Sequence, residues 1–400
     1  MQQRYVELTE PTLRPDYAGL DDIGSSLIEL TVDLNVYRRN LTEIQKFVAP
    51  SKVIAVLKAN AYGFGVAGLI PVLNEFSRIS AGVANADEAL YMRTLGYNGK
   101  IVLLGYTHPK NYYQIIHSGC ELAAYRFDNI PLLAEVTAKL EHRLKLHVKV
   151  NTGMNRLGIS VDKLAEFIRT IMQFPQLEVT GLFTHLANAG EPEHRSNIVQ
   201  ANRFEQAIRI AEEELGYRPL CHIANSGALI NFPDLHLDCV RIGALQYGYR
   251  PPGDLPEDLD LDVEPCFRLT SEVIDVHRVP AGEGVGYGWA YVTERDTNIA
   301  TVPFGYADGM VRVPESQLQV LIRGKRYPVV GKVAMDYLEV ALGDDEAVAG
   351  DEVVLVGGQG DEYIPLEEVA EKAGALTYQL SSSWGHRIRR VYDGNDDSEE

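Results

Sequence analysis

Short apolar runs alternate with amphipathic stretches through the first 250 residues of the chain. Eight runs are nearly continuous in apolar residues, as expected of parallel strands that are buried on both faces. They span residues 53–57, 79–84, 101–105, 121–125, 146–150, 179–184, 221–224 and 240–245. Apolar residues at helical spacing lie between them, most clearly at residues 86–94 and 196–215. A strand followed by a helix eight times predicts an α/β fold of the (β/α)8 TIM-type barrel, and a doubly wound open sheet is the alternative.

The pattern changes after a Pro- and Gly-containing stretch at residues 250–254. Short β-like runs follow, punctuated by Gly and Pro, with one short helical pattern at residues 366–373. The runs span residues 267–279, 298–302, 319–322, 326–333, 337–340 and 352–356. They predict a second, mainly antiparallel β domain. We therefore divide the chain into an N-terminal extension (1–25), the barrel (26–262), a C-terminal β domain (263–394) and an acidic tail (395–400).

Charge and composition exclude several classes of partner. The formal net charge of −19 repels nucleic acid and anionic membrane surfaces. No apolar run reaches the roughly 20 residues that cross a bilayer, and residues 1–15 lack the apolar core of a secretory signal. The four cysteines form no C-x-x-C pair, which favours reduced thiols. We expect a cytoplasmic protein that binds neither nucleic acid nor a membrane.

Basic and small polar residues follow the predicted barrel strands. In such barrels the active site lies at the C-terminal ends of the strands. The candidates there are Lys58, the segment 151–156, His185, the segment 225–227 and Arg241. A mouth of this composition suits a phosphorylated ligand, and a lysine at a strand end can form a Schiff base.

Several other kinds of site are absent from the sequence. It contains no P-loop and no G-x-S-x-G elbow. Neither of the Gly-rich segments 282–286 and 357–360 both follows a strand and opens a helix, as a dinucleotide loop requires, so we interpret them as turns. No histidine pair has metal-ligand spacing, and we predict no metal.

Eight short motifs occur in order between about Val32 and Tyr392, and together they resemble the alanine racemases. The barrel part carries Val-Leu-Lys-Ala-Asn-Ala-Tyr-Gly at 56–63, Lys-Val-Asn-Thr-Gly-Met-Asn-Arg-Leu-Gly at 149–158, His-Ile-Ala-Asn-Ser at 222–226 and Arg-Ile-Gly-Ala at 241–244. The second part carries Gly-Tyr-Gly at 286–288, Gly-Tyr-Ala-Asp-Gly at 305–309, Ala-Met-Asp at 334–336 and Arg-Val-Tyr at 390–392. The resemblance implies a pyridoxal-phosphate-dependent isomerase that interconverts L- and D-alanine.

The resemblance also implies roles for individual residues. Lys58 would hold pyridoxal phosphate covalently and serve as the base on one face of the substrate. Tyr287 would be the base on the other face, contributed by the neighbouring subunit of a homodimer. His185 and Arg241 would support this pair, with Arg241 facing the cofactor's ring nitrogen. An arginine does not give up its proton, so that nitrogen would stay unprotonated.

Further residues would bind the cofactor phosphate and the substrate. The expected phosphate-side residues are Tyr62, Asn225, Ser226, Gly243, Ala244 and Tyr392. Arg156 and the backbone of Met335 would bind the carboxylate of a small amino-acid substrate, and Tyr306 would line its entrance. Lys149 matches a lysine that is carbamylated in some relatives, which would relieve its repulsion of Arg156.

The sequence departs from the usual motifs at four positions. Phe64 replaces a common histidine, Asn151 a common aspartate, Asn155 a common glycine and Ala334 a common cysteine. Phe64 and Ala334 differ in size from the usual residues, so a reshaped site and a substrate range that includes serine stay open.

Two other functions remain as alternatives. One is a decarboxylase of the same two-domain plan, which places a cysteine near an aspartate in its β domain. The segment 334–336 has no such cysteine. The other is a non-catalytic pyridoxal-phosphate-binding protein, although such relatives are usually a lone barrel.

Overall fold

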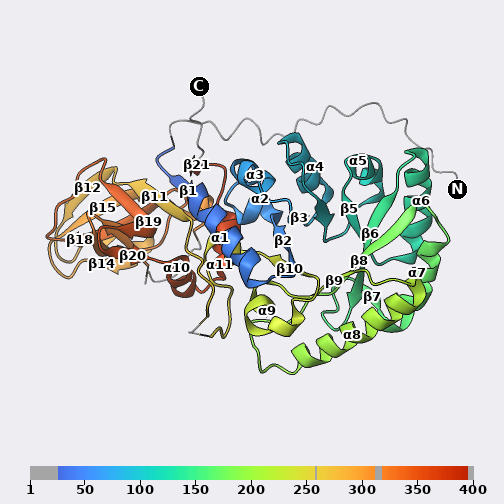
Figure 1. Cartoon of the computed structure of the whole chain (residues 1–400). Helices are drawn as coiled ribbons and strands as arrows, with labels where there is room; N and C mark the ends of the chain where they lie inside the picture. Colours follow the sequence, from blue (N-terminus) through green and yellow to red (C-terminus); the bar gives the residue numbers. More distant parts are fainter. Residues whose placement is uncertain (1–25, 257–258, 311–317, 395–400) are drawn as a thin grey trace.

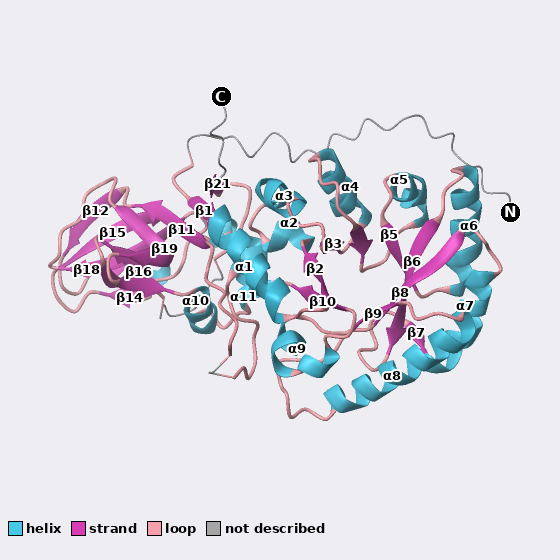
Figure 2. Ribbon diagram, in the orientation of Figure 1, coloured by secondary structure: helices cyan, strands magenta, loops and turns pink. Residues whose placement is uncertain are grey.

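The chain forms two bodies that lie side by side (Figure 1). A computed structural model describes residues 26–256, 259–310 and 318–394. One body is a barrel with helices around it, and the other is rich in β-strands, as the colouring by secondary structure shows (Figure 2). The N-terminal extension and the acidic tail of the sequence-based division lie outside the described residues.

Eight parallel strands form the barrel, in the order β10-β2-β3-β4-β5-β6-β8-β9. Backbone hydrogen bonds from Asp238 N to Cys221 O and from Arg241 N to Ala224 O join β10 to β9 and close the ring. The strands are β2 (Lys52–Val56), β3 (Ile79–Val83), β4 (Ile101–Leu103), β5 (Glu121–Ala124), β6 (Leu144–Asn151), β8 (Leu177–Phe183), β9 (Leu220–His222) and β10 (Cys239–Ile242). All eight predicted strands are confirmed, and the open-sheet alternative is wrong. A short strand β7 (Ile159–Ser160) pairs with β6.

Helices follow the strands and cover the outside of the barrel (Figure 2). They are α1 (Leu34–Phe47), α2 (Lys58–Tyr62), α3 (Val66–Asn74), α4 (Ala86–Thr94), α5 (Tyr112–His117), α6 (Ile130–Lys139), α7 (Leu164–Met172), α8 (Ser196–Leu215) and α9 (Ser226–Asn231). Helix α1 begins where the Asp33 carboxylate accepts the backbone N–H groups of Asn35 and Val36. Helix α8 ends at Gly216, whose φ of 75° suits glycine. The predicted helices at 86–94 and 196–215 are confirmed.

The second body is built on a mainly antiparallel sheet in the order β12-β15-β18-β17-β16-β19-β11-β1-β21. Its strands are β1 (Glu29–Asp33), β11 (Phe267–Glu272), β12 (Asp275–Val279), β15 (Thr297–Pro303), β16 (Gln319–Ile322), β17 (Lys325–Val330), β18 (Tyr337–Gly343), β19 (Glu352–Gln359) and β21 (Arg389–Asp393), with β20 (Glu362–Ile364) beside β19. A small hairpin of β13 (Gly284–Val285) and β14 (Tyr291–Val292) and helices α10 (Leu366–Lys372) and α11 (Thr377–Ser383) complete it. The predicted second domain is therefore antiparallel in the main, as expected.

Strand β1 differs from the sequence-based division, which assigned residues from 26 onward to the barrel. It pairs with β11 and β21 in the second sheet. Its residues alternate between half-buried and buried, the pattern of a strand with one face on the core. Both ends of the described chain therefore meet in the second body.

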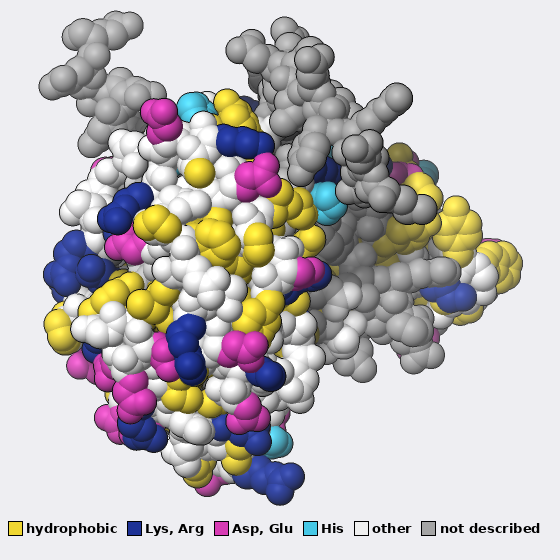
Figure 3. All heavy atoms as spheres, turned by 90° about the vertical axis from the view of Figure 1, so that its right-hand side faces the viewer, with side chains coloured by type: hydrophobic (Ala, Val, Ile, Leu, Met, Phe, Trp, Pro, Cys, Tyr) yellow, Lys and Arg dark blue, Asp and Glu magenta, His cyan; other side chains and the backbone are white. Residues whose placement is uncertain are grey.

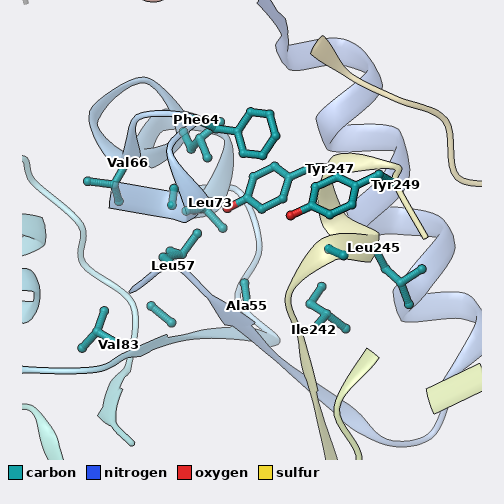
Figure 4. Packing of buried hydrophobic residues seen from close by; sticks show 14 of the residues in the cluster. Ala55, Leu57, Phe64, Val66, Leu73, Val83, Ile242, Leu245, Tyr247 and Tyr249 are labelled. Carbon is teal, nitrogen blue, oxygen red and sulfur yellow. The ribbon is translucent and has the colours of Figure 1, made fainter. Parts of the chain in front are cut away.

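An aromatic cluster joins the two bodies, and Figure 4 shows the rings of Phe64, Tyr247 and Tyr249 within it. The Phe64 ring is fully buried and stacks on Tyr247 with 4.2 Å between ring centroids. Its centroid lies 4.7 Å from that of Phe267 and 5.4 Å from that of Trp384. The larger side chain at position 64 therefore adds to the interdomain core, where it buries apolar surface, and does not point into the barrel mouth.

The surface carries both signs of charge in mixture. On the face opposite the second body, Lys and Arg side chains alternate with Asp and Glu, and no single sign covers it (Figure 3). Within the described ranges, no helix is long and apolar enough to cross a membrane.

Candidate active site

Lys58 stands at the C-terminal end of barrel strand β2 and opens an unusual backbone turn. Residues 59–62 all adopt left-handed conformations, with φ between 52° and 58°. Left-handed backbone costs roughly 1–2 kcal/mol for each residue other than glycine, so neighbouring groups must hold this turn in place. The Glu88 carboxylate accepts the N–H of Ala59 at 2.8 Å and that of Ala84 at 2.8 Å.

The last strand of the chain holds the other side of this turn. Arg390 Nε donates to Gly63 O at 2.9 Å. The Tyr392 hydroxyl lies 3.0 Å from Phe64 O and 3.1 Å from Gly65 O. A Cβ at Gly65 would approach that hydroxyl to 1.9 Å, so only glycine permits the contact. Strand β21 therefore rests directly on the segment that carries Lys58.

The environment of Lys58 makes its amine less basic. Burial lowers the pKa of Lys58, the positive charge of Arg156 lowers it further, and the negative charge of Glu88 acts in the opposite sense. The Lys58 Nζ lies 5.7 Å from the centroid of the Tyr62 ring. A lysine with a lowered pKa is more often neutral, and a neutral amine is the form that attacks a carbonyl.

Lys149 lies close by on β6 and is almost fully buried. Its Nζ donates to Leu104 O at 3.2 Å and lies 5.1 Å from the Phe183 ring centroid. Burial and the charges of Arg241, Arg156 and Lys58 lower the pKa of Lys149 to about 8. Lys149, Arg241, Arg156 and Lys58 thus form a group of four cations. Within the described ranges, no carboxylate forms an ion pair with any of them. The barrel mouth is therefore a site for anions.

Arg241 on β10 is the most enclosed of the cations, with 4% of its surface exposed. Its terminal nitrogens donate to the carbonyl oxygens of Thr184, His222 and Ile223 at 2.8 to 3.0 Å. His185 Nδ1 lies 3.3 Å from Arg241 Nη2, and it must accept because arginine only donates. Among the described contacts none uses the Arg241 Nε, so that donor is left for a ligand.

The histidine beside Arg241 is neutral. Burial lowers the pKa of His185 well below its ordinary value, and the charges of Arg241, Arg156, Lys149 and Lys58 lower it further. Since Nδ1 accepts from Arg241, the single proton of the His185 ring is on Nε2.

Small and hydroxyl-bearing residues meet beside Arg241. Gly243 N donates to Ser226 Oγ at 2.8 Å, and both residues are buried. A Cβ at Gly243 would lie 2.7 Å from the Tyr62 hydroxyl, so the missing side chain lets that hydroxyl approach the backbone. The Asn225 side chain accepts from Ala228 N and begins helix α9 directly before Ser226. Ala244 follows Gly243 and is also buried.

Three further residues predicted from the second domain are Tyr287, Tyr306 and Met335. Among the described contacts, none of their side chains contacts Lys58 or Arg241 of the same chain. Tyr287 is in the hairpin of β13 and β14, and its side chain is 70% exposed. Figure 1 places β14 within the second body, away from the barrel strands. Tyr306 and Met335 are brought together, because Tyr306 N donates to Ala334 O and Ala307 N donates to Met335 O. Both side chains are exposed.

One ion-pair network fixes the loops of Tyr306 and Met335. Arg387 makes two bonds of 2.7 and 2.8 Å to the fully buried Asp308 carboxylate and one of 2.7 Å to Asp336. We expect Arg387→Met to lower the free energy of unfolding by about 2–3 kcal/mol, because Asp308 would stay buried and charged without its partner. Chemical denaturation should detect the loss.

Arg389→Met is the matched control for Arg387→Met, since the exposed Arg389 side chain bonds only the half-buried Glu29 among the described residues. It should change the stability by less than about 1 kcal/mol. Equal stabilities of the two variants would contradict the prediction.

Sequence reasoning missed two acidic residues, Glu88 at the mouth and Glu121 deeper in the barrel. Glu88 follows Asn85 by three positions, and Asn85 caps helix α4, so the pair appears as an ordinary helix cap. Glu121 begins strand β5 and is bonded to a buried histidine. No motif in the sequence marks it. Tyr392 was predicted beside the phosphate; its hydroxyl lies on the turn that follows Lys58, and its contact with the phosphate stays a prediction.

Comparison with known proteins covers nearly the whole described chain. A family model described as "Alanine racemase, N-terminal domain" matches residues 32–251, and one described as "Alanine racemase, C-terminal domain" matches residues 266–392. A protein of Desulfovibrio desulfuricans named "Alanine racemase" is 34% identical over 369 residues, 90% of this chain and 96% of that protein. One of Desulforamulus reducens with the same name is 36% identical over 367 residues, 91% of this chain and 98% of that protein.

Solved structures give the same result. The alanine racemase from the D-cycloserine-producing Streptomyces lavendulae has a TM-score of 0.87 at 32% identity, covering 92% of this chain and 97% of that one. The alanine racemase from Bacillus anthracis with bound L-Ala-P has a TM-score of 0.84 at 31% identity, covering 92% of this chain and 96% of that one.

Proposed function

The chain belongs to the alanine racemase family, and from that premise we propose that it interconverts L- and D-alanine with pyridoxal phosphate held at the barrel mouth. The observation that carries the proposal is Lys58, an amine of lowered pKa at a barrel strand end. Around it stand three further cations without a carboxylate partner among the described residues. No observation favours the decarboxylase or the non-catalytic alternative.

The residues at the mouth fit pyridoxal phosphate. Lys58 would bind it covalently, and the Tyr62 and Ser226 hydroxyls with the backbone N–H groups of Gly243 and Ala244 would hold its phosphate. The missing side chain at Gly243 and the absence of acidic partners support this assignment. Arg241, with its Nε unused, would face the ring. When bound, the cofactor withdraws electrons from the substrate and acidifies its α-C–H.

Racemisation needs a proton acceptor on each face of the α-carbon. The Lys58 amine would take or return the proton on one face, and the Tyr287 hydroxyl of the partner subunit on the other. Arg156 would hold the substrate carboxylate, with the backbone of Met335 and the ring of Tyr306 at the entrance. The exposure of Tyr287 and the place of the following strand β14 in the second body of this chain support a homodimer with a shared site.

Lys149 would carry a carbamate that pairs with Arg156. Carbon dioxide reacts with a neutral amine, and a pKa of about 8 leaves about half of the Lys149 amines neutral at pH 8. We expect ¹³C-bicarbonate at pH 8 to give one carbamate signal in ¹³C NMR and to raise the turnover of bicarbonate-depleted enzyme. The signal should be absent from Lys149→Ala. An unlabelled wild-type protein with unchanged turnover would refute the carbamate.

The function itself is tested in deuterated water. Purified protein loaded with pyridoxal phosphate is incubated with single L-amino acids, and the α-proton and the D-enantiomer are followed together. D-alanine that carries deuterium at the α-carbon is the expected product. Faster turnover of serine would keep the chemistry and change the substrate. Neither exchange nor D-product, from protein that binds the cofactor, would disprove the racemase, and carbon dioxide release would indicate the decarboxylase.

A further inference from the structure

A line of four hydrogen-bonded side chains runs through the barrel beneath the mouth. Arg241 is the one member of this line for which a role in the reaction was predicted. Arg241 Nη1 lies 3.0 Å from His222 Nδ1, His222 Nε2 lies 2.9 Å from His147 Nδ1, and His147 Nε2 lies 2.7 Å from Glu121 Oε2. The four side chains come from strands β10, β9, β6 and β5, and all are buried.

The barrel leaves room for this line at one specific place. Strand β8 lies between β6 and β9, and Gly181 of β8 faces the His147 ring. A Cβ at Gly181 would lie 2.3 Å from His147 Nδ1, which is the atom that meets His222. The two imidazoles reach each other across β8 only because this strand position has no side chain.

The donor and acceptor roles along the line follow from Arg241 at one end. Arginine only donates, so His222 Nδ1 accepts and the proton of the His222 ring is on Nε2. His222 then donates to His147 Nδ1, which leaves the His147 proton on Nε2, where it is donated to Glu121. Both imidazoles are neutral in this arrangement. Burial and the charge of Arg241 lower the pKa of His222 well below its ordinary value, which agrees with a neutral ring.

Glu121 supplies the negative charge at the far end. Burial by itself would raise the pKa of the Glu121 carboxyl, but the His147 hydrogen bond and the nearby lysines Lys100 and Lys145 hold it below its ordinary value. Arg241 has no carboxylate in contact among the described residues, and burial lowers the pKa of its guanidinium to about 10. The other titratable groups near Arg241 are His185, His222, Cys239 and Lys149.

We propose that Glu121 is a positioning residue of the reaction, which acts through His147 and His222 to hold the Arg241 guanidinium oriented toward the cofactor ring. The proposal rests on the proposed function, because it assigns Arg241 to that ring. Two neutral imidazoles transmit the stabilisation, since each hydrogen bond polarises the next in a buried line. The carboxylate thus compensates a buried cation that it does not touch.

The test removes the charge of Glu121 and keeps its hydrogen bond. In Glu121→Gln the amide oxygen still accepts from His147. We expect kcat to fall about tenfold with the KM for alanine nearly unchanged. The alkaline limb of the pH profile should move to lower pH, because the loss of a buried negative charge lowers the pKa of the other cations beside Arg241, Lys149 among them. The visible absorption of the bound cofactor should change its pH dependence in the same direction.

Glu178→Gln is the matched control, since Glu178 lies on β8, the strand next to β6, and takes no part in the line. It should behave as wild type in every measurement. A Glu121→Gln enzyme whose kcat, pH profile and cofactor absorption equal those of the control would overturn the proposal. If Glu121→Gln does not fold, His147→Gln interrupts the same line at its next residue and is judged by the same measurements.

Nitrogen-15 NMR of the wild-type protein without cofactor tests the line independently of the activity. His147 and His222 should both be neutral with an unprotonated Nδ1. A protonated Nδ1 on either ring would overturn the direction of the line and with it the proposal. A protein with the expected tautomers but without racemase activity would instead disprove the proposed function alone.

Discussion

Replacing Lys58 with alanine is expected to lower alanine racemisation at least about 10⁴-fold, because one side chain would supply both the covalent attachment of the cofactor and one of the two bases. The cofactor would remain only through its phosphate contacts. Borohydride reduction followed by peptide mass spectrometry should therefore find pyridoxal phosphate on Lys58 of the wild type and on no lysine of the variant.

The control for Lys58→Ala is Lys52→Ala, at the opposite end of the same strand, where the side chain is exposed. It should retain the cofactor and the wild-type turnover. Substantial racemisation by Lys58→Ala, or cofactor trapped on another lysine such as Lys149, would show that the reactive amine had been assigned to the wrong residue.

Replacing Tyr287 with phenylalanine is expected to lower racemisation in both directions about 10²- to 10⁴-fold, the range of a single acid–base group. The loss should have a distinctive form. With Lys58 still present, one enantiomer should continue to exchange its α-proton with deuterated water, while the other should not. Retained exchange on both enantiomers would mean that another group serves the second face.

Mixing the two inactive proteins tests whether the site is shared. A heterodimer of Lys58→Ala and Tyr287→Phe chains would have one barrel with both intact bases if Tyr287 comes from the partner subunit. After complete subunit exchange, about a quarter of the sites should be active. If both bases come from one chain, no activity returns.

The barrel could be predicted from the sequence because its strands are buried on both faces and therefore appear as continuous apolar runs. Strand β1 alternates instead, and nothing local shows that it pairs with β21 at the far end of the chain. The candidate residues at the barrel mouth could be predicted because each of them directly follows a predicted strand. Phe64 was expected to alter the mouth, but its side chain direction depends on the aromatic residues of both domains that surround it.

Glu121 could not be found in the sequence for a related reason. A glutamate at the start of a strand is usually solvated, and its role here depends on two histidines and a glycine from three other strands. Tyr287 shows the opposite case, since its motif is plain in the sequence whereas strand β14, which follows it, lies in the second body, away from the barrel strands (Figure 1). Contacts between residues far apart in the sequence decide both the role of Glu121 and the position of Tyr287.

The hold of strand β21 on the Lys58 turn has a consequence for the order in which the protein matures. The bond from Arg390 to Gly63 joins residues 327 positions apart, so Arg390 is synthesised long after the turn that it anchors. A chain still on the ribosome can complete all eight barrel strands while its left-handed turn lacks this support. Cofactor loading should therefore wait until the whole chain has emerged, so that a truncated product does not retain pyridoxal phosphate.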